Sequence, residues 1–220
     1  MTQNDKAPQG AGTTLLVLVV DRSGSMQSIR SDMEGGIRHL LEEQATQPGT
    51  CLVTLAQFDT EYELLFQGMP AAEVTGYQLV PRGSTALLDA IGRTIAEVRA
   101  WLGKVPAGPR PELVIFAVVT DGLENASREW SRDKVMAAVK ERSEAGWQFS
   151  FLGANQDAIK EGRGLGVAPA GAMTYAPTPH AAFAAMSSLS HSVSRARSGA
   201  DPRLTYTDEE RQAAAGEAPA

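Results

Sequence analysis

The sequence predicts an α/β fold of the doubly wound class: a mostly parallel sheet with one antiparallel edge strand and helices on both faces. Two continuous apolar runs, residues 15–20 and 113–119, are typical of strands buried on both faces of a parallel sheet. Segments with helical periodicity separate most of the strand-like segments, as right-handed crossover connections require. Only residues 59–61 separate one pair of strand-like segments, so the second strand of that pair runs antiparallel to the first.

The elements can be placed in order along the chain. We predict strands at residues 15–20, 51–58, 62–66, 113–119, 147–152 and 172–175. Apolar residues at helical spacing predict helices over residues 29–41, 87–102, 135–139 and 183–193. Ser131 is a candidate N-cap for the third helix. Gly162, Gly164 and Gly166 predict a flexible loop, because their spacing does not match a dinucleotide-binding turn.

One domain is expected between two loose ends. Residues 1–13 are small and polar without periodicity, and they predict a flexible leader. Residues 14–197 hold the periodic segments and form the expected domain. Residues 198–220 are rich in Ala, Pro and Glu and carry five acidic against two basic residues, which predicts a disordered acidic tail.

Charge and composition exclude several classes of protein. The chain has 220 residues with 20 Lys and Arg against 26 Asp and Glu, a net charge of −6, which argues against nucleic-acid binding. The one cysteine, Cys51, cannot form an intrachain disulfide, and we expect it to be a small buried side chain. The longest run of large apolar residues is only six residues long, which is too short for a membrane span. We therefore expect a cytoplasmic protein.

Oxygen-bearing side chains follow two of the predicted strands. Asp21, Ser23 and Ser25 come directly after the first strand, and Asp121 comes after the fourth. In an open parallel sheet the ligand site lies at the carboxyl ends of the strands, where the strand order reverses. Residues 67–82 can span roughly 50 Å when extended, enough to bring Thr85 back to the same edge of the sheet. The sequence therefore places five oxygen donors around one crevice.

Three hydroxyls and two carboxylates form a set of oxygen ligands that suits a hard cation. Mg²⁺ fits this set best, with Mn²⁺ or Ca²⁺ as alternatives, whereas zinc and copper prefer nitrogen and sulfur ligands. Mg²⁺ takes about six ligands, so at least one position is left for water or for a carboxylate from a partner.

These motifs resemble a known family. The segments Asp21-x-Ser23-x-Ser25, Gly83-Ser84-Thr85 and Thr120-Asp121-Gly122 look like the metal-ion-dependent adhesion site of von Willebrand factor type A domains. The resemblance is strongest to stand-alone intracellular bacterial members. It implies that Ser23, Ser25 and Thr85 bind the metal directly and that Asp21 and Asp121 act largely through water.

The resemblance also implies a function. A partner's Asp or Glu would complete the coordination of the metal, and the chain would act as a monomeric, non-catalytic adaptor. Bacterial relatives often work beside AAA+ ATPases of the MoxR type or in stress-response systems, either of which would supply the partner. The partner footprint is expected to include five residues beside the crevice: Arg22, Asp59, Glu124, Asn125 and Asn155. The alternative for each of them is an ordinary solvated loop residue.

Two alternatives stay open at this point. Aspartates at strand ends that hold Mg²⁺ also serve phosphoryl chemistry, so a Mg²⁺-dependent phosphohydrolase is the second candidate function. Against it, Asp21-x-Ser23 lacks the second aspartate of the common aspartyl-phosphate motif. The resemblance further implies that the last helix, with Phe183, Met186, Leu189 and Val193 on its apolar face, can shift with the metal site. The sequence alone favours a fixed covering helix.

Overall fold

A computed structural model of the chain describes residues 12–106, 110–154 and 157–216. In this part of the chain six strands form one sheet in the order β3-β2-β1-β4-β5-β6. Their bounds are β1 Thr13–Asp21, β2 Thr50–Phe58, β3 Tyr62–Pro70, β4 Leu113–Thr120, β5 Gln148–Ala154 and β6 Ala172–Tyr175. All neighbours pair in parallel except β2 and the edge strand β3. The predicted fold class is confirmed.

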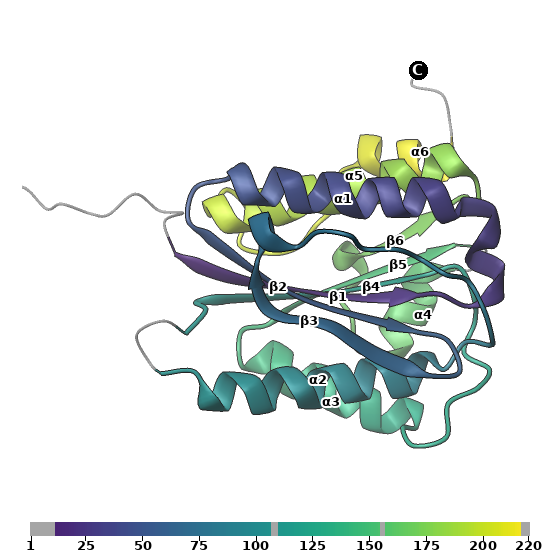
Figure 1. Cartoon of the computed structure of the whole chain (residues 1–220), viewed down its shortest axis with the longest axis horizontal. Helices are drawn as coiled ribbons and strands as arrows, with labels where there is room; N and C mark the ends of the chain where they lie inside the picture. The colour runs from purple at the N-terminus through teal and green to yellow at the C-terminus, as the bar shows by residue number, and fades with distance from the viewer. Residues whose placement is uncertain (1–11, 107–109, 155–156, 217–220) are drawn as a thin grey trace, which may run out of the picture.

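Helices cover both faces of this sheet (Figure 1). The helix α1 Arg30–Thr46 lies with α5 Pro179–Ser198 and α6 Asp208–Ala215 on one face. The other face carries α2 Leu87–Lys104, α3 Arg132–Glu144 and α4 Ala158–Gly164. Short 3₁₀ turns complete the described elements: η1 Gly24–Ile29, η2 Ala71–Glu73 and η3 Pro169–Gly171. No helix in the described ranges has both the length and the apolarity needed to cross a bilayer.

The core has two halves, one on each face of the sheet. On β1, Leu16, Leu18 and Val20 face the α1 and α5 side, and the alternate residues from Leu15 to Val19 face α2. All of these side chains are fully buried. Successive residues of a strand point to opposite faces, so a continuous apolar run is what a central strand needs.

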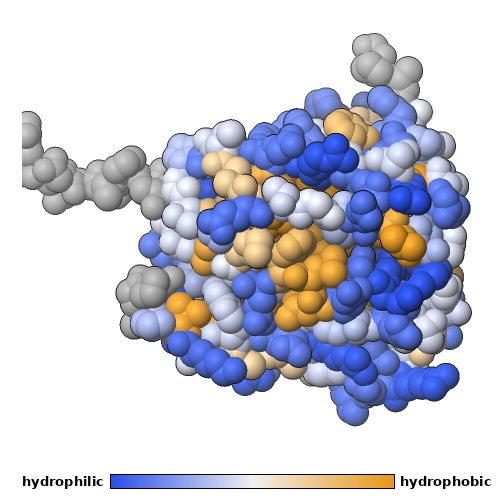
Figure 2. All heavy atoms as spheres, viewed as in Figure 1, coloured by the Kyte–Doolittle hydropathy of each residue, from blue (hydrophilic) through white to orange (hydrophobic). Residues whose placement is uncertain are grey.

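The edge strand β3 is less buried than the central strands. Its burial is only partial along most of its length, including Leu64, Leu65 and Phe66. Figure 2 shows apolar surface across the middle of this view, where β3 faces the viewer between the two helical layers.

The C-terminal segment corrects the expectation of a disordered tail from residue 198. Residues 199–216 fold back on the domain, with Leu204, Tyr206 and Ala214 buried. A capping box between Thr207 and Glu210 starts α6, and Arg195 on α5 binds the Glu210 carboxylate through two nitrogens at 2.8 and 3.0 Å. The domain therefore extends well beyond residue 197.

Three further expectations change in detail. Residues 1–11 of the predicted leader lie outside the described residues, but Thr13 already belongs to β1. Gly162 and Gly164 lie in α4 rather than in a loop. On α5, Phe183 is 38% exposed, whereas Met186, Leu189 and Val193 are fully buried. Phe183 packs its ring beside His39 of α1 and thus lies outside the core.

Candidate metal centre

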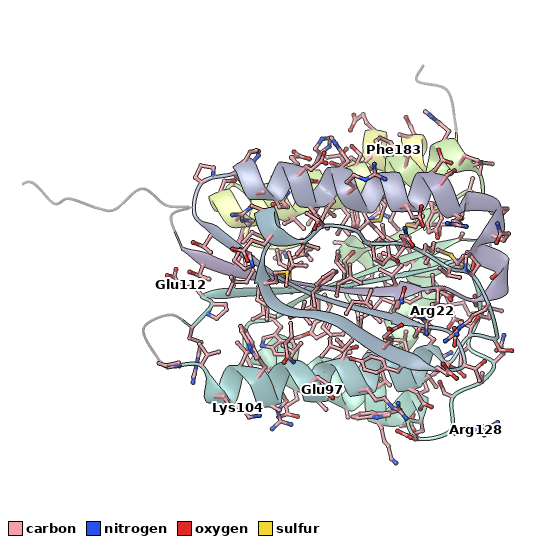
Figure 3. All side chains as sticks on the ribbon, viewed as in Figure 1. Arg22, Glu97, Lys104, Glu112, Arg128 and Phe183 are labelled. Carbon is pink, nitrogen blue, oxygen red and sulfur yellow. The ribbon has the colours of Figure 1, made fainter. Side chains whose placement is uncertain are left out.

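The candidate site lies where the strand order of the sheet reverses. β1 and β4 are parallel neighbours, with Val20 opposite Val119, so Asp21 and Asp121 leave the sheet side by side. In Figure 3, Arg22 and Arg128 lie at this end of the sheet and Glu112 lies at the opposite end. The two carboxylates therefore lie together at the carboxyl ends of the central strands, where ligand sites of open parallel sheets form.

Asp21 is held from both sides. Its Oδ1 accepts a hydrogen bond from the Ser23 backbone N–H at 2.6 Å, and its Oδ2 accepts one from the Thr120 hydroxyl at 2.6 Å. Asp21 is fully buried, and this burial raises its pKa to about 6 despite the two hydrogen bonds. A buried carboxylate in this position favours the binding of a cation, which would compensate its charge.

Ser25 joins the two carboxylate loops. Its hydroxyl donates to Asp121 Oδ1 at 2.6 Å, and it lies 3.1 Å from the Ser23 hydroxyl. Burial raises the pKa of Asp121, and the hydrogen bond from Ser25 opposes that shift. The Ser23 and Ser25 hydroxyls and the carboxylate after β4 thus already form one connected group.

Thr85 completes the set from a third loop. The side chain is buried, and a Cβ at Gly122 would lie 3.0 Å from the Thr85 hydroxyl and 3.8 Å from that of Ser25. Gly122 therefore leaves free the space that a larger residue would fill between these two hydroxyls. Three hydroxyls and two carboxylates around this space fit a hard divalent cation such as Mg²⁺. Ser23, Ser25 and Thr85 could hold it directly, with Asp21 and Asp121 close by.

The Thr85 segment is fixed against the β2–β3 hairpin. Ala86 N–H donates to the Asp59 carbonyl at 2.9 Å, and Ser84 N–H donates to the Thr60 hydroxyl at 3.1 Å. Gly83 has a φ of +66°, which a residue with a side chain rarely adopts. This turn brings Ser84 and Thr85 against the β2–β3 hairpin.

Arg22 and Asp59 are structural here, which corrects their place in the expected partner footprint. They are only 5% and 2% exposed, and they form an ion pair at 2.9 Å. Asp59 also accepts from Arg82 at 2.7 Å. Burial opposes ionisation of Asp59, but the Glu61 N–H and the two guanidinium groups outweigh it and hold its pKa below the usual value. These ion pairs link the loop after β1 and the segment before Thr85 to the β2–β3 hairpin.

The three other residues of the expected footprint differ in their surroundings. Glu124 accepts from the N–H groups of Leu88, Ala126 and Ser127, so it organises its own loop and caps α2. Asn125 is exposed, yet its Oδ1 accepts from the Thr85 N–H at 2.9 Å. Asn155 lies outside the described residues, so its place in the footprint stays a prediction.

Two residues contribute to the site beyond those expected from the sequence. Thr120 appeared only as part of the Thr-Asp-Gly motif, although its hydroxyl is a direct partner of Asp21. Tyr175 at the end of β6 is buried and donates to the Thr120 carbonyl at 3.1 Å. No local sequence pattern indicates this role of Tyr175, because its partner Thr120 is 55 positions away along the chain.

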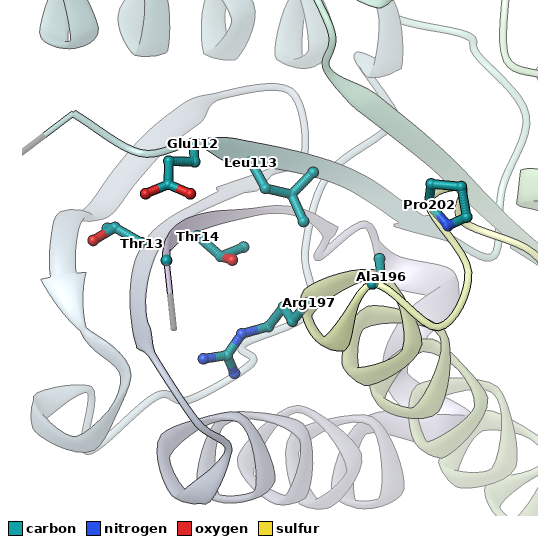
Figure 4. Close-up of a pocket in the computed structure, with 9 residues that line it drawn as sticks. Thr13, Thr14, Glu112, Leu113, Ala196, Arg197 and Pro202 are labelled. Carbon is teal, nitrogen blue, oxygen red and sulfur yellow. The ribbon is translucent and has the colours of Figure 1, made fainter. Parts of the chain in front are cut away.

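A hollow of about 480 Å³ lies at the opposite end of the sheet, where Thr14, Glu112 and Arg197 line it (Figure 4). The Arg197 guanidinium there donates to the carbonyls of Gln44 and Pro48, next to the C-terminus of α1. It therefore neutralises the negative end of that helix. Across the described ranges, no group of three or more His, Cys, Asp or Glu side chains could hold a metal, so the hydroxyl-rich site is of a different kind.

Comparison with solved structures identifies the fold. Proximal thread matrix protein 1 from the mussel byssus superposes with a TM-score of 0.62 at 15% identity, over 86% of this chain and 47% of that one. A form of the mussel protein with zinc in its metal-ion-dependent adhesion site gives a TM-score of 0.61 at 14% identity, over 87% and 47%. A von Willebrand factor type A protein from Catenulispora acidiphila gives 0.57 at 16% identity, over 82% and 42%.

The chain spans about half the length of these solved structures. No protein-family model and no curated protein sequence matches it. The six-stranded sheet with its antiparallel edge, its two helical layers and these superpositions agree, and the chain has the von Willebrand factor type A fold.

Proposed function

We propose that this chain is a metal-dependent protein-interaction module without catalytic activity of its own. The observation that carries the proposal is the convergence of Ser25, Thr85 and Asp121 around the space left by Gly122. These donors come from three separate loops, each pinned by its own hydrogen bonds. Such an arrangement supports a preformed ligand cage rather than an ordinary polar surface.

The chain's own residues would divide the work of binding. Ser23, Ser25 and Thr85 supply neutral oxygens, while Asp21 and Asp121 supply charge at a greater distance. A bound Mg²⁺, with Mn²⁺ or Ca²⁺ as alternatives, would supply a Lewis acid that accepts a carboxylate oxygen from a partner. Neutral hydroxyl ligands leave more of the cation's charge available to that carboxylate. Zinc in the site of the mussel protein supports a divalent ion here.

The partner would be a protein that presents an Asp or Glu. Within the cytoplasm, an AAA+ ATPase of the MoxR type or a component of a stress-response system is the partner class that we propose, with this chain acting as a monomer.

An affinity-capture experiment tests this function. The tagged chain is incubated with candidate ATPase partners in Mg²⁺ and in EDTA, beside the Asp21→Ala variant. We expect retention of the partner only by the original sequence and only in Mg²⁺. Retention that is equal in EDTA and by Asp21→Ala would contradict the proposal. Metal-dependent hydrolysis of p-nitrophenyl phosphate that Asp21→Ala abolishes would instead favour the phosphohydrolase.

A further inference from the structure

The backbone of Thr85 lies outside regular secondary structure. α2 begins at Leu87, so the N–H groups just before it have no partners within the helix. Ser84 and Ala86 donate theirs to the β2–β3 hairpin, to Thr60 and Asp59 respectively. The N–H of Thr85 itself donates to a different loop, to the side-chain Oδ1 of Asn125 at 2.9 Å.

This contact is reciprocal. The backbone N–H of Asn125 donates to the Thr85 carbonyl at 3.0 Å, and Ala126 donates to the same carbonyl at 3.2 Å. Asn125 therefore holds both the N–H and the carbonyl of Thr85. With its backbone N–H and carbonyl both bound, the Cα and Cβ of Thr85 are held where its hydroxyl borders the space beside Gly122.

The loop that carries Asn125 is itself held by internal hydrogen bonds. Gly122 N–H donates to the Thr120 hydroxyl at 3.1 Å, and the Glu124 carboxylate accepts from Ala126 and Ser127 at 2.9 and 2.7 Å. The same loop begins with Asp121. One short segment thus supplies a carboxylate of the site and fixes the backbone of a hydroxyl ligand from another loop.

We propose that Asn125 is a positioning residue for the metal site: it sets the Thr85 hydroxyl relative to Asp121 and contacts neither metal nor partner. This inference rests on the proposed function, since it requires that the site binds a divalent cation. Residues that orient metal ligands typically change metal affinity 10- to 100-fold when they are removed. The role differs from a partner contact, which would leave the affinity for the bare ion unchanged.

The test uses Mn²⁺ alone as the probe, with free ion measured by electron paramagnetic resonance on the full chain. We expect Asn125→Ala to weaken Mn²⁺ binding roughly 10- to 100-fold. Asn125→Asp keeps the acceptor for Thr85 N–H, and we expect its affinity to stay within about threefold of the original or to become tighter. Ser127→Ala is the matched control: it removes a hydroxyl from the same loop that bonds Glu124 and Asp89 but not Thr85. We expect Ser127→Ala to shift the urea midpoint about as much as Asn125→Ala does and to leave Mn²⁺ binding unchanged.

The outcomes separate this inference from the proposed function. If the original chain binds no Mn²⁺, both are overturned. If it binds Mn²⁺ but Asn125→Ala binds equally well, or Asn125→Asp binds as weakly as a disrupted Asn125→Ala, only the positioning role is overturned. Should Asn125→Ala fail to fold, hydrogen exchange in the original metal-free chain decides. We expect the Thr85 amide to be protected, and exchange at the rate of a free amide would overturn the role.

Discussion

The Thr120 hydroxyl donates to Asp21 Oδ2 at 2.6 Å, across the two strands between which the order of the sheet reverses. Both residues are fully buried, so the hydrogen bond is shielded from water. Tyr175 binds the carbonyl of the same Thr120 from β6. The carboxylate that begins the metal motif is therefore fixed by the core of the sheet and not by its surface loops alone.

Burial of Asp21 gives the metal-free protein an unusual pH dependence. The folded pKa of about 6 lies above the unfolded value of 3.8, so the folded state binds the extra proton between these limits. The contribution of Asp21 to the free energy of unfolding therefore decreases as pH rises from about 4 to 6. We expect metal-free Asp21→Asn to be more stable than the original at pH 7, by at most about 3 kcal/mol.

The Asp21→Asn experiment consists of urea unfolding in EDTA at pH 4 and pH 7. The Thr120 hydroxyl can turn toward the Gly122 carbonyl, 3.1 Å away, and accept from the new amide. The difference in stability between the two proteins should grow with pH. A difference that is constant over this range would show that Asp21 titrates normally.

Ser25 should matter for the metal and little for stability. It is exposed, and its described side-chain contacts are with Asp121 and Ser23. We expect Ser25→Ala to weaken Mn²⁺ binding at least about tenfold, by analogy with the loss of groups around metal sites. Ser28→Ala is the control on the same 3₁₀ turn, because its described hydrogen bond goes to the Ser25 carbonyl at 3.5 Å and to no carboxylate of the site. Calorimetric titration of both variants should separate them, and equal affinities would exclude Ser25 as a ligand.

Loss of one partner from the buried ion pair between Arg22 and Asp59 should destabilise the fold. Removal of Asp59 leaves the buried Arg22 guanidinium paired, among the described residues, only with the half-exposed Glu63 carboxylate, so we expect Asp59→Ala to lower the free energy of unfolding by about 3 kcal/mol. Glu61→Ala removes a carboxylate that is 73% exposed and pairs with Arg82. Its cost should stay below about 1 kcal/mol. Urea unfolding compares the two, and similar losses would mean that the Asp59 network adds nothing beyond surface pairing.

The C-terminal segment should be required for a stable domain. Tyr206 is 7% exposed, and its hydroxyl lies 2.5 Å from that of Ser150 on β5. We expect Tyr206→Ala to destabilise the fold by about 3 kcal/mol, as the loss of a large buried side chain does. Tyr206→Phe should cost only about 1 kcal/mol. Thermal unfolding of the three proteins checks this. A Tyr206→Ala variant as stable as the original would mean that the C-terminal segment does not belong to the stable domain.

Periodicity explains why most of the fold could be predicted from the sequence. The central strands β1 and β4 are buried on both faces, and this requirement leaves a direct record in residues 15–20 and 113–119. The C-terminal segment leaves a weaker record, because Leu204, Tyr206 and Ala214 are widely spaced among polar residues. The Thr207 and Glu210 pair was the local signal that could have indicated α6.

The candidate site divides in the same way. The structure brings Asp21, Ser23, Ser25, Thr85 and Asp121 together, and each of them belongs to a short motif at the end of a strand or the start of a helix. The sequence places Arg22 and Asp59 on a partner surface, and this is wrong because their burial depends on a pairing across 37 positions. Long-range pairing of this kind cannot be read from one sequence without knowledge of the tertiary contacts.

The position of a bound ion tests the metal site most directly. Crystals grown in MnCl₂ should give one strong anomalous peak at the carboxyl ends of β1 and β4, within bonding distance of the Ser23, Ser25 and Thr85 hydroxyls. The peak should vanish in Asp21→Ala crystals. No peak at this position under saturating Mn²⁺, or a peak ligated by other residues, would contradict the proposed metal-dependent function.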